Sequence, residues 1–143
     1  MEKLDDIVFY MLERSIKKYR QYAQKRLIAA GHSITIDQWL VLSVIKKHPE
    51  KSIIEIAEKV FKDAASVSRI IDLLVRSRLL KRSVLEKDRR RFQINITPKG
   101  EKALKAVKPI VLENRKNALK GIRKTEIDQL NTLLNKIISN CHE

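Results

Sequence analysis

The sequence predicts a mainly α-helical protein with one small β-hairpin, and three observations support this prediction. The 143 residues include only three Gly and three Pro, so few turns are available and long helices are expected. Apolar residues recur at helical spacing over most of the chain. Residues 80–85 and 92–97 instead read as two short strands on either side of a charged loop, with Phe92, Ile94 and Ile96 alternating against Gln93 and Asn95. A chain of this length forms one domain with a real core.

Long amphipathic helices are predicted at both ends of the chain. Residues 3–30 carry an apolar stripe over about seven turns, and Gly31 can end that helix in a left-handed cap. Two further helices are expected after the hairpin, over residues 98–121 and 125–139. Because a helix as long as 3–30 cannot bury its whole stripe within one protomer, we expect part of it to meet another chain.

The middle of the chain shows the start signals of three shorter helices. Thr35 and Ser52 each begin a capping box, in which the side chains of the first and fourth residues exchange hydrogen bonds with the backbone. Asp63 is a good N-cap for a helix over residues 64–77. Since the helices that begin after Ser52 and Asp63 have so brief a connector, they form a helix-turn-helix candidate.

Positive charge is concentrated around the predicted hairpin. Residues 76–91 hold eight Lys or Arg against two acidic residues, a surplus of six. The whole chain has a net charge of +14, which implies an acidic macromolecular partner, nucleic acid before an anionic membrane. The alternative explanation of this charge is that a small lysine-rich protein is basic and soluble without binding a polyanion. A helix followed by a hairpin with an arginine-rich tip suits a polyanion with two grooves, which is duplex DNA.

Several classes of protein are disfavoured by the composition. The single cysteine, Cys141, excludes an intrachain disulfide framework and a multi-cysteine zinc site, and the three His are scattered, so we expect neither metal nor cofactor. No grouping of nucleophile, base and oxyanion donor suggests an enzyme. Without a visible signal peptide or a bilayer-spanning apolar run, we expect a cytoplasmic protein and no membrane partner.

Three motifs resemble those of the MarR family of winged helix-turn-helix transcription regulators, and the similarity covers essentially the whole chain. They are Ser66-Val-Ser-Arg-Ile-Ile-Asp-Leu-Leu74 on the predicted recognition helix, Asp88-Arg-Arg90 in the wing, and Ile96-Thr-Pro-Lys-Gly100 after it. The chain departs from the family in lacking Gly in the turn at residues 60–63 and in the connector at residues 76–79. These departures bear on the geometry of the two turns.

The resemblance implies an organisation and a function. Residues 1–31 and 101–143 would form a helical dimerisation region, and residues 32–100 the winged helix-turn-helix that binds DNA. The homodimer would bind a palindromic operator in double-stranded DNA as a repressor, relieved by a small aromatic or phenolic effector. The alternative is a sequence-tolerant architectural DNA-binding protein without an effector.

Eight residues are candidates for DNA binding: Ser66, Ser68, Arg69, Arg76, Asp88, Arg89, Arg90 and Arg91. Arginine can grip O6 and N7 of guanine, and in a narrow minor groove it meets focused negative potential. Asp88 is expected to brace the wing, since a carboxylate near phosphate repels it. The alternative for all eight is a solvated polar surface. Further candidates for phosphate contact are Lys62, Lys81, Arg82 and Lys87.

Aromatic residues near the predicted dimer helices provide a candidate effector pocket. Tyr19, Tyr22 and Trp39 could line it between those helices and the DNA-binding lobe, with packing in the core as the alternative. Cys141 follows the apolar stripe of the last helix, so we interpret it as a packed or frayed terminal residue rather than a redox sensor.

Overall fold

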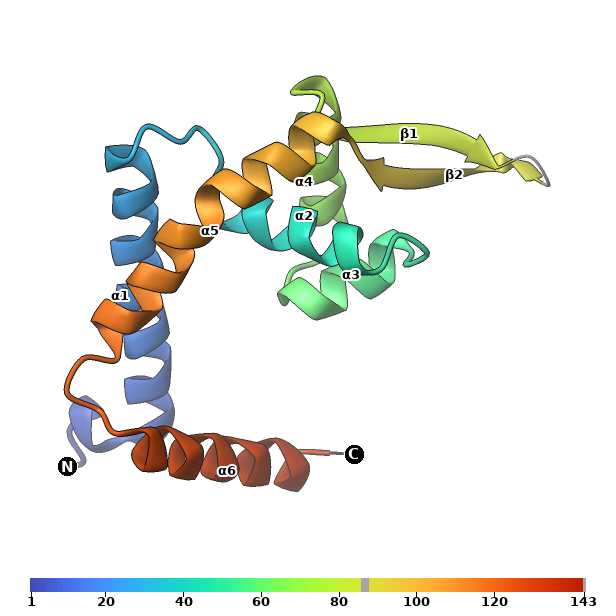
Figure 1. Ribbon diagram of the computed structural model, residues 1–143. Coiled ribbons are helices and arrows are strands. Elements are labelled where there is room, and N and C mark those ends of the chain that lie inside the picture. Colours follow the sequence, from blue (N-terminus) through green and yellow to red (C-terminus); the bar gives the residue numbers. More distant parts are fainter. Residues whose placement is uncertain (86–87, 143) are drawn as a thin grey trace.

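The fold is six α-helices and one antiparallel hairpin among the residues described (Figure 1). The computed structural model describes residues 1–85 and 88–142, and the side chains of residues 85–92 lie outside that description. The elements are, in order, a short 3-10 turn Leu4–Asp6, α1 Val8–Ala29, α2 Ile36–Lys47, α3 Ile53–Val60, α4 Ala64–Arg76, β1 Leu80–Leu85, β2 Asp88–Ile96, α5 Pro98–Ala118 and α6 Lys124–Asn140. The predicted fold class is therefore confirmed.

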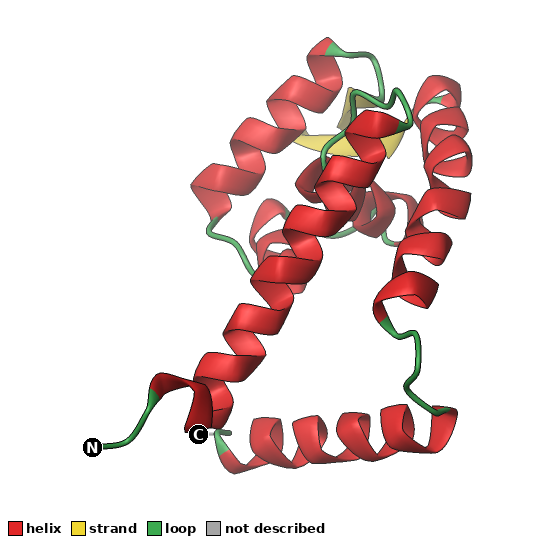
Figure 2. Cartoon of the chain, turned by 90° about the vertical axis from the view of Figure 1, so that its left-hand side faces the viewer, coloured by secondary structure: helices red, strands yellow, loops and turns green. Residues whose placement is uncertain are grey.

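The helices α2, α3 and α4 pack into a lobe from which the hairpin projects (Figure 1). The two long helices α1 and α5 pack against each other and run away from the lobe, and α6 lies across their far end. Turned by 90°, the same three helices outline a triangle below the lobe (Figure 2). Helices α1 and α5 thus connect the lobe to α6, which lies at the opposite end of the molecule.

One hydrophobic core joins the lobe to the long helices. Its largest fully buried side chains come from α1, α2, α3, α4 and β1: Leu27, Leu42, Ile45, Ile56, Ile71, Leu74 and Leu80. Val107 and Val111 of α5 belong to the same cluster. In contrast, α6 buries no residue, and large apolar side chains stay exposed on it and on α1: Val8, Phe9, Ile16, Leu130, Leu133 and Ile138. The apolar stripes of α1 and α6 are therefore only partly used within one chain.

The predicted caps are present. Thr35 and Ser52 complete their capping boxes with Gln38 and Glu55. Thr97 accepts the Gly100 amide at 3.0 Å ahead of Pro98, which occupies the first helical position, where its missing N–H costs nothing. Gly31 follows α1 with φ +84°, the left-handed geometry expected there.

The structure differs from the sequence-based boundaries at the starts of α1 and β2 and at the end of α5, which stops at Ala118 rather than Gly121. The helix predicted from residue 3 starts at Val8, after the separate 3-10 turn. Strand β2 starts at Asp88 rather than Phe92, because the intervening charged residues lack the apolar alternation that marks a strand. The two turns without glycine place Phe61 at φ 59° and Arg78 at φ 63°. Both backbones are left-handed, a conformation that favours glycine.

Candidate nucleic-acid interface

The N-terminal turn of α4 presents an ordered polar cluster. The Asp63 carboxylate accepts the Ser66 amide at 2.7 Å and the Ser66 hydroxyl at 2.9 Å. Arg69 donates to the Ser66 hydroxyl at 3.3 Å. The hydrogen bond from the Ser66 amide holds the pKa of Asp63 below its usual value, so this cap is ionised at neutral pH. The cluster fixes where Ser66 and the exposed Arg69 stand.

Buried residues hold this polar face of α4 outward. Val67, Ile71 and Leu74 are buried in the lobe core. Among the candidates on α4, Arg69 and Arg76 are exposed, whereas Ser66 and Ser68 are half-buried. The structure therefore places these four predicted residues on one helix, off its apolar face.

The hairpin brings a second basic segment alongside α4. Strands β1 and β2 are antiparallel, with Leu80 opposite Ile96 near the lobe and Val84 opposite Phe92 towards the tip. Asp88 begins β2, and Arg89, Arg90 and Arg91 continue it, so their backbone lies at the outer end of the hairpin (Figure 1). Their side chains lie outside the described residues, as does Lys87. Lys81 is exposed on β1.

A contact between α4 and β1 was missed at the sequence level. Asp72 of α4 accepts a hydrogen bond from the Arg82 guanidinium of β1. On the sequence alone, Arg82 is a candidate for phosphate contact. The available signal was the strand period: Arg82 lies two residues after the buried Leu80, so both point to the same face of β1.

The base of the hairpin is tied to the start of α5. The Thr97 hydroxyl donates to the Arg78 carbonyl at 2.6 Å, and the Lys99 ammonium donates to the Ser77 carbonyl at 3.1 Å. Gly100 lies so close to this connector that a Cβ there would stand 2.2 Å from the Leu79 carbonyl oxygen. The connector between α4 and β1 is therefore clamped onto the first turn of α5.

The predicted effector residues do not gather around one described cavity. Tyr22 accepts a hydrogen bond from Asn117 at 3.1 Å and lies under the Arg26 guanidinium, between α1 and α5. Trp39 packs against the core of the lobe, and Tyr19 is half-buried. These contacts favour packing, and the pocket stays a prediction.

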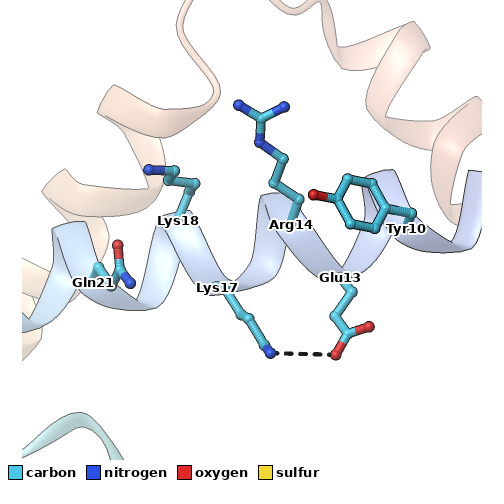
Figure 3. Close-up of a pocket in the computed structure, with 6 residues that line it drawn as sticks. All are labelled: Tyr10, Glu13, Arg14, Lys17, Lys18 and Gln21. Carbon is cyan, nitrogen blue, oxygen red and sulfur yellow. Dashed lines mark ion pairs between the residues drawn. The ribbon is translucent and has the colours of Figure 1, made fainter. Parts of the chain in front are cut away.

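Two shallow cavities lie along α1 instead. One, of about 400 Å³, adjoins the start of α2 and is lined by Arg20, Gln21, Gln24, Lys25, Ile36 and Asp37. The other, of about 280 Å³, is formed by α1 alone (Figure 3). Figure 3 shows Tyr10, Arg14 and Lys18 pointing away from the Glu13–Lys17 ion pair, which spans 3.4 Å. Both surfaces are rich in cations and lie outside the α4 and hairpin face.

Asp37 connects three parts of the molecule at the first cavity. Its carboxylate meets Arg20 of α1 at 2.8 Å and Lys62 of the α3–α4 turn at 3.2 Å. Partial burial by itself raises the pKa of Asp37, but the bonds from Arg20 and Lys62 outweigh it and hold this pKa below its usual value of 3.8. Lys62, a candidate for phosphate contact, is thus paired with Asp37.

The described part of the chain contains no cluster of three His, Cys, Asp or Glu residues placed to hold a metal ion. Across the same residues, every helix is too short or too polar to cross a bilayer. Cys141 is exposed at the end of α6, which matches the frayed terminal residue expected.

Comparison with known proteins matches this arrangement to one class. Residues 32–91 match the family model described as MarR family. A protein of unknown function from Listeria innocua is 28% identical, over 96% of this chain and 94% of its own, with a TM-score of 0.71. BpsR from Bordetella bronchiseptica is 20% identical, over 100% and 99%, with a TM-score of 0.86. MepR from S. aureus, solved with DNA, is 23% identical, over 96% and 99%, with a TM-score of 0.81.

Helices α2, α3 and α4 with the hairpin, whose strand β1 packs against α4, define a winged helix-turn-helix fold. The match over residues 32–91 confirms the resemblance to the MarR family seen in the sequence.

Proposed function

We propose that this protein is a transcription regulator that binds a palindromic operator as a homodimer and acts as a ligand-responsive repressor. One observation carries the proposal: the polar face of α4 and the arginine-bearing end of the hairpin extend from the same lobe of a chain with a net charge of +14. A helix of this kind reads base edges in the major groove, and a basic wing adds contacts in a second groove or to the backbone.

Within this proposal, the candidate residues have separate roles. Ser66, Ser68 and Arg69 lie near the N-terminus of α4, the end of a recognition helix that contacts bases. Arg76 lies about two to three turns further on, at the C-terminal end of α4, where we expect a phosphate contact. Arg89, Arg90 and Arg91 extend the wing, and Asp88 braces it. The MepR–DNA complex supports DNA as the partner of this fold.

The exposed apolar stripes support a homodimer. Ile16 of α1 and Leu133 of α6 are more than half exposed although they lie on amphipathic helices. Burying such side chains against a second copy is favourable by about 25 cal/mol per Å² of apolar surface. Residues 1–31 and 101–143 would then form the dimerisation region and residues 32–100 the DNA-binding region, with one core spanning both.

Ligand response is proposed at the junction of these regions. BpsR, whose DNA binding is regulated by 6-hydroxynicotinic acid, supports a small aromatic effector. We assign its site to Tyr19 and Tyr22 of α1 and Trp39 of α2, since α1 packs against α2 of the lobe. A ligand there would act by changing the spacing of the two recognition helices in the dimer.

Selection of bound fragments from genomic DNA, followed by footprinting, tests the regulator directly. Protection of one short palindrome supports it, whereas uniform coverage of every fragment would favour the architectural alternative. Arg90→Ala should weaken operator binding at unchanged helix content, and Lys116→Ala, an exposed position on α5, serves as the matched control. Equal affinity of Arg90→Ala and wild type across a salt series would remove the wing from the interface.

Sedimentation tests the dimer. Leu133→Asp should shift the protein towards monomer because a carboxylate would be buried in the interface. Ile54→Asp, on the equally exposed outer face of α3, should leave the mass unchanged. A monomeric wild type that still binds the palindrome would contradict the proposed assembly.

A further inference from the structure

The contact between Asp72 and Arg82 stands at the junction of the two elements proposed to meet DNA. Asp72 is the single acidic residue of α4, and Arg82 lies on β1. The Asp72 side chain is 48% exposed and the Arg82 side chain 39% exposed, so the protein partly shields the pair from water. An acidic side chain on a helix that faces a polyanion opposes binding by charge alone, so its presence there calls for another role.

The position of Arg82 in the hairpin shows what the contact restrains. Leu80 fixes the inner end of β1 in the core at 2% exposure, and Thr97 and Lys99 clamp the connector that precedes the strand. Two residues beyond Leu80, Arg82 reaches α4; two residues further, Val84 is half exposed. Among the described residues, the pair is therefore the outermost polar link recorded between the hairpin and α4.

A hairpin held only at its base can tilt about that base. A second tie further out removes this freedom, because the strand is then fixed at two points along its length. We propose that Asp72 and Arg82 are positioning residues that set the angle and spacing between the recognition helix and the wing. The inference rests on the proposed function, and it reassigns Arg82 from phosphate contact to alignment of the wing.

This role has a consequence that separates two kinds of DNA binding. Operator binding requires α4 and the wing to be positioned at the same time. A wing already held at a fixed angle therefore loses less conformational entropy on binding than a wing that can tilt. Binding to random duplex depends on phosphate contacts, which tolerate a tilted wing. Loss of the pair should therefore lower the preference for the operator rather than the overall attraction to DNA.

The test compares dissociation constants for the selected operator and for a random duplex of equal length over a salt series. The variants are Asp72→Asn, Arg82→Gln, and the exchange Asp72→Arg with Arg82→Asp. We expect each single variant to bind the operator about tenfold more weakly, in line with the coupling of paired charges, with random-duplex binding unchanged or tighter. The exchange should recover most of the operator preference, since it rebuilds the pair with its polarity reversed.

The control removes an acidic side chain elsewhere, outside the proposed dimerisation region and the candidate DNA contacts: Glu50→Gln, whose exposed carboxylate lies 3.5 Å from His48 in the turn after α2. It should leave the ratio of operator to random binding unchanged. Melting curves of all variants establish that each is folded.

Three results would overturn the inference. If Asp72→Asn tightens operator and random binding equally, Asp72 acts only through repulsion. If Arg82→Gln weakens both equally and reduces the slope of log affinity against log salt by about 0.9, Arg82 is a phosphate ligand. If the exchange variant is no better than the single variants, the pair does not align the wing. A wild type that binds no duplex at low salt would instead refute the proposed function itself.

Discussion

Gly100→Ala should destabilise the protein although alanine is the better helix former. Gly100 lies in the first turn of α5, where the chain turns from the wing into the long helix. A Cβ there would stand 2.2 Å from the Leu79 carbonyl oxygen and 2.7 Å from Cγ1 of Ile96. The Ile96 side chain can rotate, but the Leu79 oxygen belongs to the backbone of the clamped connector. The clash therefore needs a backbone shift.

The size of the effect follows from what that shift disturbs. Ordinary carbon–oxygen contacts begin at about 3.3 Å, so α5 and the connector must separate by about 1 Å. The Thr97 amide donates to the Leu79 carbonyl at 3.1 Å and the Thr97 hydroxyl to Arg78 at 2.6 Å, and both bonds would be strained. Overpacking and the strained hydrogen bonds together cost about 1–3 kcal/mol. The higher helix propensity of alanine returns at most about 1 kcal/mol. We expect a net loss of about 2 kcal/mol.

Thermal unfolding followed by circular dichroism at one fixed protomer concentration measures this loss, since the melting temperature of an oligomer depends on concentration. A loss of that size lowers Tm by about 4–8 °C in a chain of this length. Gly31→Ala is the matched control: its φ is +84°, but a Cβ there meets nothing within 4 Å, so only the left-handed backbone penalty of about 1 kcal/mol applies. A Gly100→Ala variant that melts at or above wild type would refute the reasoning.

Two other changes test the unusual turns and the Asp37 contacts. Phe61→Gly and Arg78→Gly should each raise the free energy of unfolding by about 0.5–1 kcal/mol, because glycine adopts the left-handed backbone without strain; urea titration measures this, and destabilisation by both would show that the side chains outweigh the strain. Asp37→Asn should destabilise at neutral pH: since the pKa of Asp37 is lowered from 3.8, its stabilisation is present above that value and disappears as pH falls through the lowered pKa. Urea midpoints of wild type and Asp37→Asn should therefore converge in acid, and a constant gap would contradict the assigned role of the charge.

Most of the fold could be predicted because its signals are local. Thr35, Ser52, Asp63 and Thr97 begin their helices through hydrogen bonds to backbone amides three residues away, so the residue types alone mark the positions. The start of β2 could not be placed in the same way. Its outer half consists of charged residues without apolar alternation, so no pattern in the sequence marks where the strand begins.

The candidate site was predictable as a surface but not as a set of contacts. The apolar period of α4 separates its buried side from Ser66, Arg69 and Asp72 without reference to other elements. Which cation pairs with which acid depends on how distant segments pack, so the links from Lys62 to Asp37 and from Arg82 to Asp72 were not visible.

The two turns without glycine show how packing overrides local preference. Val60 is buried at the end of α3, and Asp63 must reach the Ser66 amide to cap α4, which leaves Phe61 and Lys62 to reverse the chain. With both ends held, the left-handed turn is the short route, and Phe61 adopts it with its side chain 91% exposed. Arg78 does the same between α4 and the buried Leu80. In both places the buried residues on either side of the turn supply the stability that the turn residue itself lacks, so α4 and the hairpin keep their positions without glycine in the turns.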